Sequence, residues 1–307
     1  MSELLAVVDL GSNAARFLLV RIDPGIGYRI LLEQRVQTRL GAGQPGELPG
    51  AAIELTLSSV RRFLDRVENG SRPRVLAVAT AAVREAANRD RLLDALRDRE
   101  GVDVRVLSGG DEARLGALAA LQSLPVQDGV IADLGGGSLQ LTCIRSGSIA
   151  EAASVALGAV RTTERHLRGD PPTPGEVRAL RRDVREHVLG VLPPARRGDE
   201  LIGLGGTVRA LARLHLAATE EEHRGRHGLR IQQSDVAAIR ERLERLPLHR
   251  RRRMPGLKAE RADIILAGAI TIEELMAFGG YARLTVCTGG VRDGLLWHET
   301  WNGVTAR

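Results

Sequence analysis

Two stretches of the chain place an aspartate at the end of an apolar run and follow it with small residues. Residues 7–13 read VVDLGSN and residues 131–138 read IADLGGGS, so Asp9 and Asp133 take the same place in both. Glycine lets a backbone approach a ligand closely and turn successive N–H groups toward one anion. A carboxylate beside such a loop suits a hard cation such as Mg²⁺, which bridges protein and phosphate oxygens. The pattern predicts phosphate chemistry, and a hairpin turn without a ligand is the alternative.

These two loops contain most of the candidate ligands. Asp9 and Asp133 are the candidate Mg²⁺ ligands. The candidate phosphate-binding residues of the loops are Ser12, Asn13, Gly135, Gly136, Gly137 and Ser138. Because the same pattern occurs twice, we expect two related domains whose loops face each other across an interdomain cleft, where ligand sites are common.

Composition limits the class of protein. The chain has 307 residues, enough for two domains, and contains no apolar run of membrane-spanning length. Its N-terminus lacks the basic segment of a signal peptide, and Cys143 and Cys287 lie in apolar runs, as buried thiols would. We therefore expect a cytoplasmic protein with no membrane partner. Aromatic residues make up only 2%, which disfavours a nucleic-acid partner bound by stacking, despite the net charge of +6.

The elements that must position these loops alternate between strand and helix patterns, which predicts an α/β fold. Apolar residues recur at helical spacing within residues 53–67, 111–124, 173–191, 234–246 and 260–278. Thr173, Pro174, Gly175 and Glu176 form a capping-box pattern with proline at the first helical position, and Ser234 is the predicted N-cap of another of these helices. A short polar break follows residue 124, so we expect an N-terminal domain over 1–125 and a C-terminal domain over 126–307.

Two further motifs carry residue types that contact phosphate in other proteins. Gly205, Gly206 and Thr207 stand between a strand and a helix, where helix N-termini bind phosphate or nucleotide; a tight turn is equally consistent with them. The sequence HRRRR at 249–253 offers positive charge for a polyanion, although such runs more often form solvated loops. The seven histidines show no metal-binding spacing.

The full set of motifs resembles the exopolyphosphatase and guanosine-pentaphosphate phosphohydrolase (Ppx/GppA) family. The motifs occur in the family's order and cover nearly the whole chain. They are DLGSNAAR at 9–16, ATAAVREAAN at 79–88, LSGGDEARL at 107–115, DLGGGS at 133–138, LGAVR at 157–161, GLGGT at 203–207, RADIILAG at 261–268 and TGGVRDGLL at 288–296.

The resemblance implies a duplicated ribonuclease-H-like fold, as in actin and acetate kinase, in a short form with two domains. It also implies Mg²⁺-dependent removal of the terminal phosphate from inorganic polyphosphate, or of the 5′-phosphate from guanosine pentaphosphate. In this family pattern Glu112 is the catalytic glutamate, Asp133 joins it in the site, and Arg84 contacts substrate phosphate. From position alone, Glu112 is an acid in a first helical turn and Arg84 lies on a solvated helix face.

Two positions depart from the family pattern. Ala14 stands where the first loop usually has a second serine, and Gln140 stands where the family usually has glutamate. Glutamine cannot carry charge or accept a proton at neutral pH, so we expect weaker Mg²⁺ binding. Since Leu139 and Leu141 would face the core, alternation along the strand turns Gln140 the other way, toward the cleft.

The leading interpretation is a Mg²⁺-dependent phosphohydrolase. The alternative is a sensor that binds polyphosphate or a guanosine alarmone without hydrolysing it, and Gln140 is the feature that favours it. A kinase of the same superfamily leaves the Glu112 motif unexplained. The sequence leaves open which substrate dominates, the preferred chain length, the effect of Gln140 on activity and whether the chain forms a homodimer.

Overall fold

The computed structural model of the chain describes residues 3–305 except 24–26, 45, 68–72, 197 and 222–224. The chain divides into two compact units, one formed by Met1–Leu115 with Val291–Arg307 and the other by Gly116–Gly290. These units differ from the expected domains, 1–125 and 126–307, because the C-terminal helix groups with the first unit. Val291, Leu295 and Leu296 of that helix share a hydrophobic cluster with Leu5 and Val7 of the first strand.

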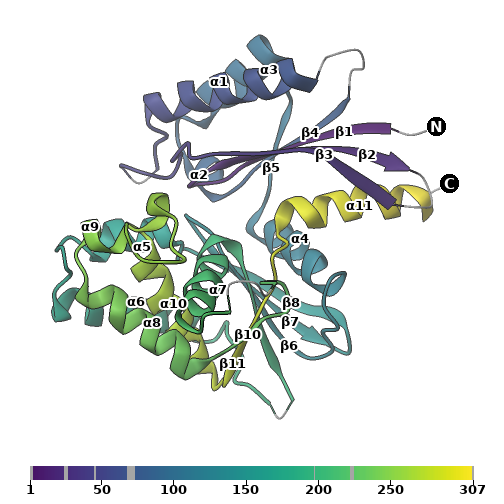
Figure 1. Cartoon of the computed structure of the whole chain (residues 1–307). Coiled ribbons are helices and arrows are strands. Elements are labelled where there is room, and N and C mark those ends of the chain that lie inside the picture. The colour runs from purple at the N-terminus through teal and green to yellow at the C-terminus, as the bar shows by residue number, and fades with distance from the viewer. Residues whose placement is uncertain are drawn as a thin grey trace. The chain divides into compact units, whose positions relative to one another are not determined.

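The first unit contains a five-stranded sheet in the order β3-β2-β1-β4-β5 (Figure 1). Its strands are β1 (Glu3–Leu10), β2 (Ala15–Asp23), β3 (Gly27–Val36), β4 (Arg74–Ala79) and β5 (Val104–Val106). The first three strands pair antiparallel, whereas β4 runs parallel to β1 and β5 parallel to β4.

The second unit contains a six-stranded sheet in the order β10-β11-β9-β6-β7-β8. Its strands are β6 (Gly129–Leu134), β7 (Leu139–Arg145), β8 (Ser148–Val155), β9 (Glu200–Leu204), β10 (Arg230–Gln232) and β11 (Arg283–Val286). Again three strands pair antiparallel, and β9 and then β11 add in parallel beside β6. The order β8-β7-β6-β9-β11 repeats β3-β2-β1-β4-β5, which confirms the predicted duplication of one α/β fold.

Helices follow the strands in both units. They are α1 (Gly50–Val67), α2 (Ala81–Glu85), α3 (Arg89–Glu100), α4 (Gly109–Leu121), α5 (Ala159–His166), α6 (Pro174–Val188), α7 (Gly205–Ala218), α8 (Gln233–Arg245), α9 (Leu248–Arg251), α10 (Ile265–Gly279) and α11 (Val291–Thr305), with a 3₁₀ turn at Ala259–Arg261. In the part of the chain that the structure describes, no helix has the length and apolar character needed to cross a bilayer.

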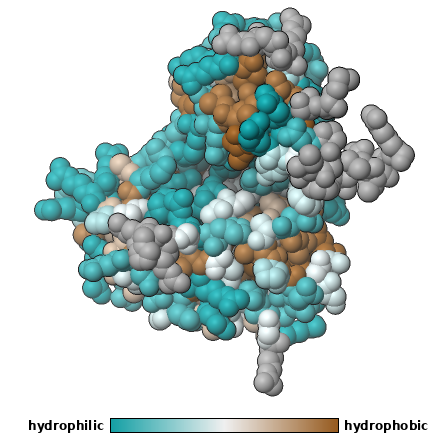
Figure 2. Space-filling model, turned by 45° about the vertical axis from the view of Figure 1, so that its right-hand side comes forward, coloured by the Kyte–Doolittle hydropathy of each residue, from teal (hydrophilic) through white to brown (hydrophobic). Residues whose placement is uncertain are grey.

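The sheets are buried on both faces because apolar residues occupy successive positions of their central strands. In β1, Ala6, Val8 and Leu10 belong to one core, which includes apolar residues of α1 and α3. Leu5 and Val7 belong to a second core with α11. Figure 2 shows a largely hydrophilic surface interrupted by apolar areas. Large hydrophobic side chains that stay exposed include three on the edge strand β3, namely Tyr28, Ile30 and Leu31.

The N-termini of α6 and α8 were both predicted from the sequence, and the structure agrees with one of the two predictions. The predicted capping box before α6 is confirmed: the Glu176 N–H donates to Oγ1 of Thr173 at 3.3 Å, and the Thr173 N–H donates to Oε2 of Glu176 at 2.7 Å. Ser234 as a cap is wrong, because α8 begins at Gln233. The Gln232 N–H donates instead to Oδ2 of Asp235 at 3.3 Å.

The HRRRR run is only partly the solvated loop that its composition suggests. Arg251 lies in α9 and is 5% exposed. Its guanidinium donates to the carbonyl oxygens of Leu246 and Ala262 at 3.0 and 3.2 Å, and it pairs with Asp170 at 3.2 Å. A buried guanidinium that satisfies backbone carbonyls holds chain segments together, so Arg251 has a structural role and does not offer its charge to a polyanion.

Candidate functional site

Asp9 lies near the carboxyl end of β1 and is 2% exposed. It stands opposite Arg16 in the β1–β2 ladder, and Nη1 of Arg16 contacts its Oδ2 at 3.1 Å. The loop that follows is closed by the N–H of Gly11, which donates to the carbonyl of Ala14 at 3.2 Å. The predicted strand, aspartate and tight turn are therefore present, and the carboxylate of Asp9 is paired with the guanidinium of Arg16.

Ser12 and Asn13 form the tip of this first loop and are both buried. The segment after β3 packs on them: the Gly41 N–H donates to the Ser12 carbonyl at 2.8 Å, and the Arg39 N–H donates to the Asn13 carbonyl at 3.2 Å. Among the described residues, Nδ2 of Asn13 has no hydrogen-bond partner although it is buried. A buried donor without a partner costs free energy, so this amide is well suited to a phosphate oxygen.

Glu112 and Arg84 meet at the same end of the first sheet. Glu112 lies in the first turn of α4 and is 6% exposed. Nη1 of Arg84, from α2, donates to Oε2 of Glu112 at 3.0 Å and to the Leu107 carbonyl at 2.9 Å. Ser108 fixes the start of α4, because its Oγ accepts the N–H of Asp111 at 3.0 Å. Arg84 is therefore a partner of Glu112 and does not lie free on a solvated helix face.

In the second unit, Asp133 lies near the carboxyl end of β6, and two glycines make room for its carboxylate. A methyl group added to Gly116 of α4 would lie 3.3 Å from Oδ2 of Asp133. One added to Gly205 would lie 2.9 Å from Oδ1, and Gly205 also has a φ of +92°, which favours glycine. Gly205 thus has a packing role beside Asp133, as well as opening α7.

The glycine loop after Asp133 is held by its carbonyl groups. It closes through the Gly135 N–H, which donates to the Ser138 carbonyl at 3.0 Å. The carbonyls of Gly135 and Gly136 accept N–H groups from the first turn of α5 at 2.9–3.2 Å, and the Gly137 carbonyl accepts Nε of Arg161 at 2.7 Å. With these carbonyls engaged, the N–H groups of Gly136, Gly137 and Ser138 are the ones suited to an anion.

Gly158 caps α5 and touches this loop directly, since a methyl group on it would lie 2.2 Å from the carbonyl atoms of Gly136. We expect Gly158→Ala to lower the free energy of unfolding by about 1–3 kcal/mol, because backbone must move to admit the methyl group. Gly175→Ala in α6 is the matched control, where the nearest contact would be an ordinary 3.8 Å. Urea unfolding of both variants checks this, and equal midpoints would contradict the close packing.

Gln140 lies on the opposite face of β7 from the core residues Leu139 and Leu141, as alternation predicted. It is 2% exposed, and its Nε2 donates to Oγ of Ser138 at 2.7 Å and to Oγ of Ser154 at 3.1 Å. It also stands directly opposite Asp133 in the β6–β7 ladder. The amide therefore supports the loop serine and is a cross-strand neighbour of the carboxylate.

We expect Gln140→Glu to lower the Mg²⁺ concentration needed for half-maximal hydrolysis by roughly tenfold, since a second carboxylate would stand beside Asp133. The new oxygen can accept the hydroxyl hydrogens of Ser138 and Ser154, so the fold should persist. Gln127→Glu, before the start of β6, is the matched control. A Mg²⁺ titration of the hydrolysis rate compares the two variants. If Gln140→Glu needed as much Mg²⁺ as wild type for half-maximal hydrolysis, or more, position 140 would not lie beside the metal.

The two hairpins have corresponding positions, and two of these hold Ala14 and Gln140. Counted from each aspartate, Ala14 corresponds to Ser138, because each carbonyl closes its own loop. Arg16 corresponds to Gln140, because each stands opposite its aspartate. The first loop has thus lost a hydroxyl that the second loop keeps.

A second repeat had escaped the sequence analysis. The tripeptide LGA occurs at 40–42, 115–117 and 157–159. The first and last copies each pack their glycine on one of the two loops, with Gly41 against Ser12 and Gly158 against Gly136. From the sequence alone, this repeated tripeptide could have pointed to the segments that support the two loops.

The predicted loop at Gly205, Gly206 and Thr207 divides into two parts. Thr207 is 1% exposed and packs under Gly268 of α10, where a methyl group would lie 2.6 Å from its Oγ1. Its burial favours the tight-turn interpretation for this residue. The guanidinium of Arg261 lies against Gly206, since a methyl group there would meet Nη2 at 1.8 Å. Sequence reasoning assigned no role to Arg261, although it begins the RADIILAG motif.

The donor set suits Mg²⁺ better than a metal that needs many protein ligands. In the described ranges, no three His, Cys, Asp or Glu side chains are grouped to hold a metal ion. Mg²⁺ commonly takes one or two carboxylates and completes its shell with water and substrate phosphate. Asp133, whose carboxylate is flanked by glycines, and Asp9, which contacts Arg16, are the carboxylates that fit this use.

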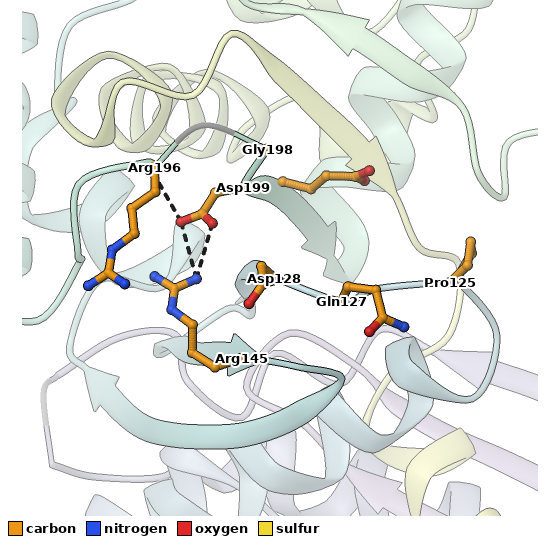
Figure 3. Close-up of a pocket in the computed structure, with 8 residues that line it drawn as sticks. Pro125, Gln127, Asp128, Arg145, Arg196, Gly198 and Asp199 are labelled. Atoms are coloured by element: carbon orange, nitrogen blue, oxygen red, sulfur yellow. Dashed lines mark hydrogen bonds and ion pairs between the residues drawn. The ribbon is translucent and has the colours of Figure 1, made fainter.

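A separate cavity of about 440 Å³ lies at the other end of the second sheet (Figure 3). Its lining includes Asp128 before β6, Arg145 at the end of β7, and Asp199 and Glu200 at the start of β9. Nη1 of Arg145 contacts both carboxylate oxygens of Asp199 at 3.2 Å. Open α/β sheets bind ligands at the carboxyl ends of their parallel strands, so this cavity is not part of the candidate site.

Comparison with known proteins agrees with these features. Residues 18–301 match the model of the Ppx/GppA phosphatase family. Exopolyphosphatase 2 of Mycobacterium tuberculosis is 30% identical over 310 residues, which cover 95% of this chain and 97% of that protein. The crystal structure of the Aquifex aeolicus Ppx/GppA family member has a TM-score of 0.83 at 27% identity and covers 99% of both chains. An exopolyphosphatase from Cytophaga hutchinsonii shares the fold, with a TM-score of 0.87 at 23% identity over 98% of both chains. The chain therefore belongs to the Ppx/GppA phosphatase family.

Proposed function

We propose that this chain is a Mg²⁺-dependent phosphoanhydride hydrolase that releases the terminal phosphate of inorganic polyphosphate, with the 5′-phosphate of guanosine pentaphosphate as a second substrate. The observation that carries the proposal is the buried Glu112, held in place by Arg84 at the carboxyl end of the first sheet. The exopolyphosphatase relative, similar over 95% of this chain, supports polyphosphate as the main substrate.

Glu112 is the proposed general base. Hydrolysis of a phosphoanhydride requires a water molecule in line with the bond that breaks and a group that orients or deprotonates this water. The carboxylate of Glu112 takes a proton from the water as the water oxygen bonds to the terminal phosphorus. The bond from this phosphorus to the bridging oxygen breaks, and the shortened chain leaves with that oxygen. Because Arg84 contacts Oε2, it fixes the orientation of the carboxylate.

The two loops are the proposed phosphate-binding elements. In the first, the Ser12 hydroxyl and Nδ2 of Asn13, which has no partner among the described residues, would donate to phosphate oxygens. In the second, the N–H groups of Gly136 and Gly137 would do so. Because Gln140 donates to Ser138, the Ser138 hydroxyl keeps its own hydrogen for a phosphate oxygen.

Asp133 is the proposed Mg²⁺ ligand, with Asp9 as a second carboxylate. Gly116, which leaves room for the Asp133 carboxylate, lies one helical turn after Glu112 in α4. When bound, Mg²⁺ would neutralise charge on the phosphate oxygens.

A non-catalytic sensor that binds the same phosphate chain is the second candidate. The observation that favours it is Gln140, which stands beside Asp133 without the charge of the usual glutamate. The sensor would bind polyphosphate but release no phosphate, and its affinity would not depend on Glu112.

A substrate panel tests the proposal. Purified protein is incubated with polyphosphate, guanosine pentaphosphate, ATP and p-nitrophenyl phosphate, each with Mg²⁺ and with EDTA, and released phosphate is measured. We expect release from polyphosphate first and from guanosine pentaphosphate second, in both cases only with Mg²⁺. Tight polyphosphate binding without release would establish the sensor instead.

We further propose a cytoplasmic location, in keeping with the thiols of Cys143 and Cys287.

A further inference from the structure

A cavity of about 400 Å³ lies at the edge of the first sheet, where β3 meets α1. It is lined by Gln34, Arg35 and Val36 of β3 and by Ser59, Arg62 and Arg66 of α1. Three of these six residues are arginines, and no acidic residue is among the six. A concave site that gathers one sign of charge concentrates ions of the opposite sign.

The two helix arginines of this cavity are not neutralised within the described residues. Arg62 donates only to uncharged groups, namely the Ser58 carbonyl at 3.1 Å and Oγ of Ser59 at 3.4 Å. Neither Arg62 nor Arg66 forms an ion pair with a carboxylate in the described part of the chain. Arg62 and Arg66 are four residues apart on the helix and both exposed, so an anion in the cavity would relieve the weak repulsion between their charges.

Strand register places this cavity beside the first phosphate loop. In the sheet, Asp9 stands opposite Arg16 and Arg16 opposite Arg35, so the backbone at the edge of the cavity lies two strands from the backbone of Asp9, about 10 Å. Val36 pairs with Ala15, directly after the loop residues Ser12 and Asn13. The cavity thus lies at the same end of the sheet as the loop.

We propose that Arg62 and Arg66 form a subsite for the part of a phosphate chain that extends beyond the loop, with β3 as the opposite wall of the groove. The planar guanidinium group is well matched to phosphate, and two of them one helical turn apart along one groove suit a linear polyanion better than a single phosphate. The inference rests on the proposed function. It predicts that contacts at the edge of the first unit make the protein bind long phosphate chains in preference to short ones. A chain of three phosphates is too short to engage both loop and cavity.

The test is binding of long-chain polyphosphate in EDTA, where no turnover occurs, measured at several salt concentrations. We expect the double variant R62Q/R66Q to bind about tenfold more weakly than wild type. Because each lost phosphate contact removes about one unit of salt dependence, the slope of log affinity against log salt should become shallower by about two. Affinity for tripolyphosphate should stay the same.

The matched control is R61Q/R99Q, which removes two charges from the same unit. Arg61 faces Glu100 at 3.1 Å and Arg99 faces Glu54 at 4.0 Å, so both are already paired. We expect this control to change polyphosphate affinity less than about twofold. If both double variants lost polyphosphate affinity equally, the loss would follow from the lower net charge alone, and the subsite would be overturned.

The outcome also separates this subsite from the proposed function. Unchanged long-chain binding in R62Q/R66Q, together with normal phosphate release, would overturn the subsite and leave the hydrolase intact. Weakened binding in a protein that releases no phosphate would support the subsite and reject the hydrolase. A single-stranded oligonucleotide of equal charge that binds more tightly than polyphosphate, and loses affinity in the same variant, would assign the cavity to nucleic acid and overturn the proposal.

Discussion

Replacing Glu112 by glutamine is expected to lower kcat for polyphosphate hydrolysis by about 10²–10⁴-fold, the usual contribution of a general base. Glutamine keeps the shape of the side chain and can still accept the hydrogen bond from Nη1 of Arg84, which lies 3.0 Å from the present carboxylate. It cannot accept a proton at neutral pH. Polyphosphate affinity should therefore change little while turnover is lost. Steady-state phosphate release and a binding measurement on the same preparation separate the two effects.

Asp111→Asn is the matched control, because Asp111 precedes Glu112 in the same helical turn and its side chain is 38% exposed. It removes the same charge but lies outside the proposed machinery, so we expect kcat within about threefold of wild type. Thermal unfolding of both variants shows whether the fold persists. Normal turnover in a folded Glu112→Gln protein would reject Glu112 as the base.

Replacing Asp133 by asparagine is expected to lower hydrolysis by about 10²-fold or more at millimolar Mg²⁺. The carboxylate is held between Gly116 and Gly205, and asparagine fits the same space without the charge. A metal ion that stabilises charge in the transition state contributes several kcal/mol, and the variant loses most of this contribution. Calorimetric titration with Mg²⁺ should show weaker binding in the variant.

Asp128→Asn, directly before β6 and at the opposite end of the second sheet, is the control for charge and location. We expect it to bind Mg²⁺ as wild type does. If Asp133→Asn kept wild-type Mg²⁺ affinity and activity, the metal site would have to be sought at Asp9 or elsewhere.

The sequence predicted the parts of the site that local rules determine. Asp9 and Asp133 each stand near a strand end before a tight turn, because an apolar run, an aspartate and small residues leave few other conformations. The start of α6 at Thr173 and Pro174 followed for the same reason, since a capping box is a local interaction.

Contacts between distant segments could not be predicted in this way. Arg84 meets Glu112, and Gly116 makes room for Asp133, only because the fold brings their elements together. The burial of Arg251 was missed for a related reason: a run of arginines favours solvent, but the carbonyls of Leu246 and Ala262 outweigh that tendency at one position. Gln140 was placed on the correct face, but its two serine partners come from the loop and from β8.

The most direct test of the central claim is polyphosphate hydrolysis in water enriched in ¹⁸O, with Mg²⁺ and with ADP present as a competing acceptor. Wild-type protein should release phosphate that carries one solvent oxygen, because water attacks the terminal phosphorus, and ATP should not accumulate. Labelled phosphate should disappear when EDTA replaces Mg²⁺. Transfer of unlabelled phosphoryl groups to ADP would make the chain a kinase, and binding with no labelled phosphate above the blank would make it a sensor; either result would contradict a hydrolase built on Glu112 and Asp133.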